Sequence, residues 1–352
     1  AWSDYPFVSF KRWIKLFGQP VMVLLIMTEP DPMEAFTRVM KRCAYFIIPI
    51  SLLFIKYYPE YGRQFDAWSG AAMNTGITTN KNTLGCDCFI LGVFFFWHTL
   101  RVWDWEPGPK RKKELRLSLF FLFMDCWLLS MAHSSTSIGV MVLASVMMLF
   151  VGFKFIDRRN VTTYLVGIIS ILVVSEMVFD LHKTIIKMLG RNEDLTGRTD
   201  IWQILLHWDL NPLLGAGFEG FWFQERVDHL ADIFGGLQLN EAHNGYLETY
   251  INLGFIGLVI TIGMILATYF KSQRALIQDY VFGRFRLAYL AAFLVYNWTE
   301  AAFRTHCVPF FLFFLVAIDY PRPTPEPVQE SVPEVDTESV HKSDMSPNGS
   351  TL

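Results

Sequence analysis

Long apolar blocks with few charged residues are the feature that most constrains the fold of this chain. The sequence is 52% hydrophobic and contains 32 phenylalanines, which is more apolar surface than a soluble domain of this length needs. Such blocks are typical of helices that cross a lipid bilayer, where every backbone polar group needs a partner within its own segment. The sequence therefore predicts an all-α fold, a polytopic transmembrane helical bundle with a long, partly helical outer loop.

The predicted spans are the apolar blocks themselves. They run over Cys43–Tyr57, Leu84–Leu100, Leu117–Met131, Ile138–Phe153, Val161–Phe179, Tyr246–Phe270, Leu287–Ala302 and Val308–Ile318, with Trp13–Thr28 as a possible further span. Several of these blocks are shorter than the roughly 20 residues that a straight span requires. We therefore expect flanking residues to complete them.

Clusters of lysine and arginine give the predicted orientation. The clusters are Arg38, Lys41 and Arg42; Lys110, Arg111, Lys112, Lys113 and Arg116; Lys154, Arg158 and Arg159; and Lys271, Arg274, Arg284 and Arg286. They fall in alternate connections, so all of them can face the cytoplasm at once. The connections 58–83, 133–137 and 180–245 then face outward, and the last is long enough to carry function.

Composition also divides the chain into parts. Residues 1–38 form an N-terminal segment that we interpret as the remnant of a truncated first part, because the sequence starts with Ala1 rather than Met. Residues 39–318 form the membrane domain, which includes the outer loop at 180–245. Residues 319–352 are rich in Pro, Ser and Glu and cannot bury a core, so we expect a disordered cytoplasmic tail.

Charge and cysteine usage exclude some classes of protein. The net charge of −3 gives no reason to expect a nucleic-acid partner. The cysteines lie in or beside apolar blocks, which favours a role as small core residues over a disulfide framework. No spacing among the histidines resembles a zinc site.

The long outer loop places Arg198 directly before a predicted short helix. Thr199 can cap a helix that begins near Asp200. An arginine beside the free N–H groups of a helix start makes an anion clamp, because the guanidinium forks onto two oxygens and the helix end adds positive potential. The alternative is that Arg198 pairs with Asp200 or Asp194 and only holds the loop in place.

The same predicted helix has an apolar side that can lie on the membrane surface. That side consists of Ile201, Trp202, Leu205, Leu206 and Trp208. Asn211-Pro212 is expected to end the helix. The run Gly215–Gly220 fits G-x-G-x-x-G, but it follows a helix and a proline turn rather than a strand, which excludes a dinucleotide site. We interpret its glycines as tight turns that pack the loop against the membrane face.

His243 lies at the start of a predicted span, beside Asn244 and near Glu241 and Glu248. Water is scarce in such a place, and the neighbouring polar groups can fix the tautomer of the imidazole. Because imidazole can take a proton at neutral pH, His243 is a candidate general base. The alternative is a structural histidine, which is the commoner role for this residue type.

The first outer loop carries the cations Arg63 and Lys81, and Asn80 and Asn82 flank Lys81 just before a span. One interpretation is that this loop only anchors the protein at the interface, together with a belt of aromatic residues. The other is that it makes a second contact to the anion that Arg198 binds.

The elements GRTDIWQ, NPLLGAGFEGFW and AHNGYLETYINLGFIGL follow one another around the long outer loop, and GITTNKNTLG enters an earlier span. Together they resemble the O-antigen ligase and polymerase superfamily of bacterial envelope proteins, over about Val39 to Ile318. Arg198 and His243 match an arginine and a histidine that the family's long outer loop supplies. Arg63 is the best match for an arginine in an earlier outer loop. The short turn SSTSIG departs from the family, which often has an arginine there.

The resemblance implies glycan transfer at the outer face of the bacterial plasma (inner) membrane. The donor would be a glycan on a polyprenyl diphosphate, and the acceptor a hydroxyl group of a glycan, lipid or protein. His243 would take the proton of that hydroxyl, while Arg198 and Arg63 would hold the leaving diphosphate. The apolar span beside them would hold the lipid tail.

Further roles are predicted for residues near these. Glu248 would orient the imidazole, and Lys81, Asn82 and Asn244 are candidate substrate contacts. No metal and no cofactor are expected, so protein cations would carry the diphosphate charge in a poorly solvated site.

Other classes of function stay open. Some relatives have been proposed as transporters of anions such as bicarbonate, and a transporter is expected to hold ionisable residues deep in its spans. Of Asp87, Asp125, Glu176 and Glu300, only Asp125 is predicted to be central, which favours the enzyme. A non-catalytic envelope scaffold is the other alternative. The sequence does not separate a ligase from a polymerase, and it does not identify the sugar.

Overall fold

The computed structural model describes residues 2–65, 70, 72–167, 170, 198–236, 238–304 and 307–319. Residues 1–320 form one compact unit. Most of the expected span Val161–Phe179 lies outside the described residues. So do the first part of the long outer loop and, apart from Asp319, the expected tail.

Helices make up nearly all of the described structure. Their bounds are α1 Pro6–Met27, α2 Pro32–Tyr57, α3 Pro59–Gly62, α4 Lys81–Trp103, α5 Pro109–Ala132, α6 Ser135–Gly152, η1 Arg158–Asn160, α9 Arg198–Leu206, α10 Gln224–Ile233, α11 Gly245–Gln278, α12 Tyr280–Thr299 and α13 Val308–Ala317. The short strands β1 Arg63–Phe65 and β2 Ala72–Asn74 pair antiparallel. The predicted all-α fold is confirmed.

Helices α4, α5, α6 and α11 are long and apolar enough to cross a membrane. Each of them covers nearly all of one predicted span and adds flanking residues to it. The other predicted spans within the described residues coincide largely with α1, α2, α12 and α13. The chain is therefore a multi-pass membrane protein.

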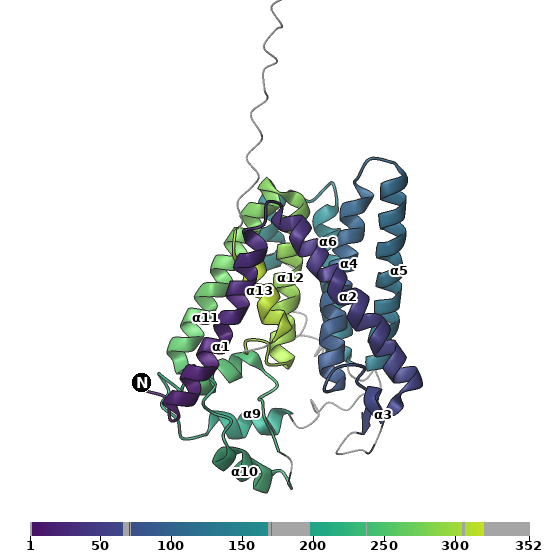
Figure 1. The fold of residues 1–352 in the computed structure, drawn as a ribbon. Helices are drawn as coiled ribbons and strands as arrows, with labels where there is room; N and C mark the ends of the chain where they lie inside the picture. Colours follow the sequence, from purple (N-terminus) through teal and green to yellow (C-terminus); the bar gives the residue numbers. More distant parts are fainter. Residues whose placement is uncertain are drawn as a thin grey trace, which may run out of the picture. The chain divides into compact units, whose positions relative to one another are not determined.

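The spanning helices differ in how far they are enclosed by the bundle. Of the apolar stretch of α4, 72% is buried inside the protein, whereas only 22% of that of α11 is buried. Helix α4 packs against α5 and α6, and α12 packs against α11, α6 and α13 (Figure 1). The exposed apolar surface of α11 suits contact with lipid.

The segments expected on the outer side gather at one end of the bundle (Figure 1). Helix α3 lies there below α2 and α5, whereas α9 and α10 lie below α1 and α11. A side-chain hydrogen bond ties the first outer loop to this end, because Asn74 Nδ2 donates to the carbonyl oxygen of Met131 at 2.9 Å. Most residues of the basic clusters belong to the helices α2, α5, α11 and α12, whereas Lys154, Arg158 and Arg159 follow α6.

The long outer loop and the first turns of α11 share a hydrophobic core. It contains Ile201, Leu205, Ala216, Phe221, Leu230, Leu239, Ala242, Leu247 and Ile251. Helix α9 therefore points Ile201 and Leu205 into the loop rather than onto the membrane surface, while Leu206 stays 56% exposed. The helix also ends at Leu206, before the expected stop at Asn211-Pro212. Apart from Leu206, the predicted apolar side packs on this core.

The glycine-rich run packs against a break in α11. Gly254 has a φ of 62°, which divides α11 into two helical parts. On one side of the break, the N–H groups of Ala216 and Gly217 donate to the carbonyls of Ile251 and Asn252 at 2.9 and 2.8 Å. On the other side, the N–H groups of two α11 residues donate to the carbonyls of Pro212 and Leu213. The loop thus satisfies backbone groups that the break leaves open.

The beginning of the chain is tied to the same loop. The N–H group of Asp4 donates to the carbonyl of Ala216 at 3.1 Å, and the rings of Tyr5 and Phe223 stack with centroids 3.8 Å apart. Helix α1 therefore starts at the end of the bundle that carries α9 and α10 (Figure 1). The expected boundary between residues 1–38 and 39–318 falls inside α2.

A candidate active site before helix α11

His243 lies in the turn that leads into α11. Its φ of 49° is in the left-handed region, which a residue with a side chain adopts when its surroundings hold it there. The next residue, Asn244, caps the helix, because its side-chain oxygen accepts from the N–H groups of Tyr246 and Leu247 at 3.0 and 3.1 Å. Asn244, a predicted substrate contact, is therefore a helix cap that fixes the position of His243.

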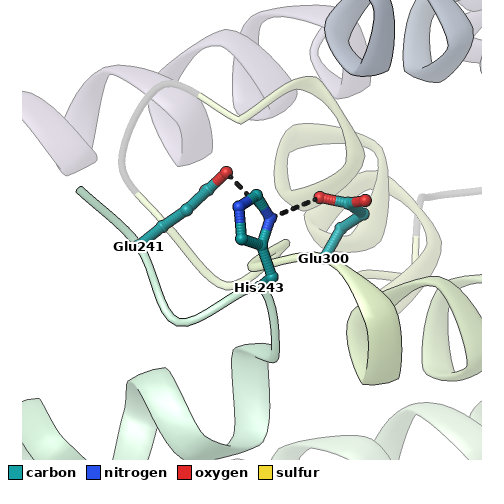
Figure 2. A group of neighbouring side chains, drawn as sticks. All are labelled: Glu241, His243 and Glu300. Carbon is teal, nitrogen blue, oxygen red and sulfur yellow. Dashed lines mark hydrogen bonds and ion pairs between the residues drawn. The ribbon is translucent and has the colours of Figure 1, made fainter. Parts of the chain in front are cut away.

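Two carboxylates meet one nitrogen of the imidazole (Figure 2). His243 Nδ1 lies 3.2 Å from Glu300 Oε2 and 3.3 Å from Glu241 Oε1. Nδ1 therefore carries the hydrogen, because a carboxylate only accepts. Among the described residues, no partner is present for Nε2. In the neutral ring this leaves Nε2 as the proton acceptor.

Arg198 shares one of these carboxylates. Its Nη2 lies 3.0 Å from Glu300 Oε1, and its Nη1 donates to the carbonyl oxygen of Thr299. The two candidate residues that the sequence placed in one loop are thus bridged by Glu300, which is 8% exposed. Within the described residues Arg198 does not pair with Asp200, and Asp194 lies outside them.

Arg304 pairs with Glu241, the second carboxylate that contacts the imidazole. Its Nη1 donates to Glu241 Oε2 at 2.7 Å. Burial opposes the charge of this guanidinium, but the carboxylates of Glu248 and Glu241 outweigh burial and raise the pKa of Arg304. The side chains form a row, Arg198–Glu300–His243–Glu241–Arg304, in which charges alternate and the imidazole is central.

Glu248 contacts other groups than the imidazole it was expected to orient. Its Oε1 accepts from Trp222 Nε1 at 2.6 Å and from Asn252 Nδ2 at 3.1 Å. Its Oε2 accepts from the N–H group of Ala242 at 3.0 Å. In the first turn of α11 the side chain points back toward the N-terminus, so it reaches the backbone before His243 and not the ring. Glu248 supports the turn, and Glu241 and Glu300 contact the imidazole.

The predicted residues of the first outer loop lie in a different environment. Arg63 Nε donates to the carbonyl oxygen of Ile55 at 3.1 Å. Lys81 and Asn82 stand in the first turn of α4, which Asn80 caps by accepting from the N–H group of Thr83 at 2.8 Å. Among the described residues, neither Lys81 nor Asn82 contacts the row around His243. The structure thus brings Arg198 and His243 together and shows no contact between them and Arg63.

Glu241, His243 and Glu300 also have the residue types of a metal site. One ligand atom from each lies within 4.8 Å of the others (Figure 2). Both carboxylates are already paired with a guanidinium, Glu300 with Arg198 and Glu241 with Arg304. The arrangement of these residues is that of an ion-pair network around a histidine.

A cavity of about 320 Å³ opens next to this row. Its walls include Arg12 and Lys15 from α1, Trp222 and Asn240 from the outer loop, and Arg304. Glu219 and Glu248 also line it. Because Arg304 contacts Glu241, the cavity is connected to the imidazole through a single carboxylate.

The acidic residues considered for a transporter are spread over different places. Asp125 of α5 is fully buried, and neither carboxylate oxygen has a hydrogen-bond partner among the described residues. Asp87 lies in the second turn of α4, and Glu300 belongs to the row around His243. Glu176 lies outside the described residues. Asp125 is therefore the candidate that matches the expectation of a deep acid.

Sequence reasoning missed several members of the site. The sequence pattern indicates only that Glu300 is an acid at a span end, and it gives no signal for Arg304 or Arg12. A carboxylate placed at the end of an apolar span is expensive and is itself a signal of function. Arg304 follows Glu300 by four residues, and both lie just after the end of α12.

Comparisons with known proteins identify the family of the chain. The family model for O-antigen ligase matches residues 78–262, which include Arg198, His243 and Glu248. A curated relative, the exopolysaccharide production protein ExoQ of Rhizobium meliloti (strain 1021), is 27% identical over 292 residues. This alignment covers 79% of the chain and 63% of ExoQ, so the chain spans less than two thirds of that relative's length. Arg63, Glu300 and Arg304 lie outside the residues that the family model matches.

Proposed function

The chain belongs to the O-antigen ligase family, and from this membership we propose that it transfers a glycan from a polyprenyl diphosphate to a hydroxyl acceptor. The transfer takes place at the outer face of the bacterial plasma (inner) membrane. The lipid bilayer holds the polyprenyl tail, and the acceptor is a glycan, a lipid or a protein. The chemistry needs no metal and no cofactor, because charged side chains of the protein carry it.

The observation that supports this proposal best is the environment of His243. Nδ1 is held by Glu300 and Glu241 at 3.2 and 3.3 Å, and among the described residues Nε2 has no partner. A ring held in this way presents Nε2 as a base of fixed direction. The carboxylates also stabilise the imidazolium that forms when the base takes a proton.

The proposed step is a displacement at the anomeric carbon. His243 Nε2 removes the proton from the acceptor hydroxyl as its oxygen attacks that carbon, and a new glycosidic C–O bond forms. The bond between the anomeric carbon and the diphosphate oxygen breaks, and its electron pair leaves with the diphosphate. The proton on His243 passes to solvent after the product departs.

Arg198 is the proposed electrostatic partner of the leaving group. One N–H of Nη1 and one of Nη2 are used by Thr299 and Glu300. The guanidinium has five N–H groups, so three remain for phosphate oxygens. Its contact with Glu300 fixes its distance from His243, and such preorganised charge is often the largest catalytic contribution.

Arg63, Lys81, Asn82 and Asn244 have weaker parts in the proposal. Arg63 and Lys81 add positive charge on the outer side, where they attract and hold the diphosphate head group at longer range. Asn82 stands beside Lys81 on α4. Asn244 acts mainly through the cap that positions His243, and Glu248 acts through the turn before it.

Reconstitution tests the proposal directly. The full chain, in liposomes with a polyprenyl-diphosphate-linked oligosaccharide and a hydroxyl acceptor, should release polyprenyl diphosphate and form a longer or acceptor-linked glycan. The His243→Ala variant, at equal abundance in the membrane, should form neither product. Product formation by this variant would contradict the role of His243. Deletion of the gene then separates the two reactions, because long chains are lost without a polymerase but stay on the lipid carrier without a ligase.

The buried carboxylate of Asp125 is the observation that favours a transporter as a second candidate. A fully buried acid within a span often binds a coupling ion or a proton. Uptake of bicarbonate by the same liposomes, together with no glycan transfer, would favour that candidate. A non-catalytic scaffold would show neither activity, and His243→Ala would leave the cell's polysaccharide unchanged.

A further inference from the structure

The row around His243 has two different ends. On one side Glu300 links the imidazole to Arg198, and on the other side Glu241 links it to Arg304. A base that delivers a hydroxyl to an anomeric carbon must lie between its two substrates. If Arg198 marks the donor side, the Arg304 side is free for the acceptor.

The cavity lies on the Arg304 side. Arg12 and Lys15 line it from α1, and Arg304 lines it from the segment after α12, so positive charges from separate parts of the chain meet there. Of the two carboxylates in the wall, Glu248 is 4% exposed and already accepts from Trp222, Asn252 and Ala242. The second carboxylate in the wall is Glu219, so three cations face two carboxylates and the wall carries one net positive charge.

The other lining groups suit a sugar. Trp222 offers an aromatic surface, and its N–H is fixed by Glu248 at 2.6 Å. Asn240 offers an amide that can both donate and accept. A concave site with an aromatic wall and a few directed polar groups is typical of small-ligand recognition.

We propose that this cavity, lined by Arg12, Lys15, Arg304, Trp222 and Asn240, is the acceptor subsite and selects a sugar unit that carries a carboxylate. The inference rests on the proposed function and adds the class of acceptor. The acidic sugar binds between α1 and the outer loop, with its carboxylate on Arg12 and Lys15. Its hydroxyl reaches toward His243 from the Glu241 side.

Binding measurements on the purified full chain in lipid nanodiscs test this subsite without turnover. The probes are trigalacturonate, the same trisaccharide with its carboxylates reduced to alcohols, and inorganic pyrophosphate. The variants are Lys15→Met and Arg12→Met. Lys11→Met is the matched control, since Lys11 lies on the same helix but does not line the cavity.

Trigalacturonate should bind the wild type and the Lys11→Met control equally. It should bind Lys15→Met and Arg12→Met on the order of ten- to a hundredfold more weakly, which is the loss typical for a hydrogen bond to a charged group. Lys15→Met carries the test if Arg12→Met fails to fold, because Arg12 also donates to the carbonyl of Glu219. The reduced trisaccharide should bind as weakly to the wild type as trigalacturonate binds to the variants.

Several results would overturn the proposal. One is a lack of trigalacturonate binding by the wild type, and another is equal binding of the reduced trisaccharide. A third is displacement of trigalacturonate by pyrophosphate combined with weaker pyrophosphate binding by Lys15→Met, which would make the cavity a diphosphate site. His243→Ala should keep trigalacturonate binding and lose transfer. If the variants lose neither binding nor transfer, only the subsite fails and the proposed reaction stands.

Discussion

Two loops of this protein each lead into a helix whose first turn is capped by an asparagine side chain. Among the described residues, only the cap of α11 lies beside a network of ion pairs. Asn80 caps α4 and Asn244 caps α11, each through its side-chain oxygen. Beside the second cap, His243 meets two carboxylates and, through them, two guanidiniums. Beside the first cap, Lys81 has no ion pair with any described residue.

The difference between the two loops shows that a helix cap positions a side chain but does not by itself provide catalytic groups. A cap fixes the backbone where the chain enters the apolar region, so either loop can hold a side chain at a set depth. Chemistry needs further groups that fix a tautomer and hold charge, and these come from α9 and from the end of α12. We therefore expect changes near Asn244 to affect transfer strongly and changes near Asn80 to affect it weakly.

The largest expected effect is that of His243. His243→Ala should lower the rate of transfer by about 10²–10⁴-fold, the range typical for loss of a general acid–base group. His243→Gln keeps some hydrogen bonding but cannot take the proton, so it should fail nearly as badly. The initial rate of product formation in liposomes measures this loss.

The matched controls for the His243 variants are His229→Ala and His229→Gln, in α10 of the same loop. His229 packs against Trp208, and it lies outside the row around His243. Equal amounts of both variants in the membrane would show that the protein inserts normally. If the His243→Gln variant keeps most of the wild-type rate, His243 has a structural role and is not the base.

Arg198 should have the next largest effect. Arg198→Lys keeps the charge but loses the fork that serves Thr299, Glu300 and the diphosphate together. We expect a loss of about 10²-fold in the rate, comparable to removal of one donor from an oxyanion site. Single-turnover rates with lipid-linked donor measure it. A rate within twofold of the wild type would show that Arg198 does not bind the leaving diphosphate.

Glu300 should have a moderate effect that depends on His243. Glu300→Gln keeps an oxygen acceptor but removes the charge shared by Arg198 and His243. We expect a decrease in kcat of about tenfold with little change in the KM of the acceptor. Glu300→Asp should recover part of the rate, since it restores the charge.

A double-mutant cycle separates positioning from folding for Glu300. In a His243→Ala background, Glu300→Gln should cost much less than it does in the wild type, because residues that act as a unit are not additive. Equal losses in the two backgrounds would show that Glu300 acts independently of the imidazole.

Arg63 should show a small effect. Its described side-chain contact is with the carbonyl of Ile55 at 3.1 Å, and it has no described contact with Arg198. Arg63→Met should raise the KM of the donor by roughly threefold to tenfold, because a solvent-exposed charge contributes little. Lys56→Met, at the end of α2, is the matched control. A loss as large as that of Arg198→Lys would show that the loops converge when the donor binds.

The sequence predicted the spans better than the site for a physical reason. Each span is a local property, since an apolar block in a membrane has to be helical. The contacts of Glu300 join residues that are 57 and 102 positions apart, and periodicity carries no information about such pairs. Arg198 and His243 were predicted from their places in the long loop and from the resemblance, and the structure shows the carboxylate of Glu300 between them. Spacing along the helix predicts a contact between Glu248 and the imidazole, but a side chain in a first helical turn points back toward the N-terminus, and Glu248 therefore contacts Trp222, Asn252 and the N–H group of Ala242.

The smallest expected effect concerns metal removal. Glu241, His243 and Glu300 place possible ligand atoms within 4.8 Å, which also suits a divalent cation. A cation there would have to displace Arg198 and Arg304 from the carboxylates and would occupy charge that the guanidiniums already balance. We therefore expect treatment with EDTA, followed by dialysis, to change the transfer rate by less than twofold. The comparison between the loops would change if EDTA abolished transfer and Mg²⁺ or Mn²⁺ restored it. The row would then be a metal site with arginines as its outer partners, and Glu241→Gln should lose metal-dependent transfer while Lys81→Met does not.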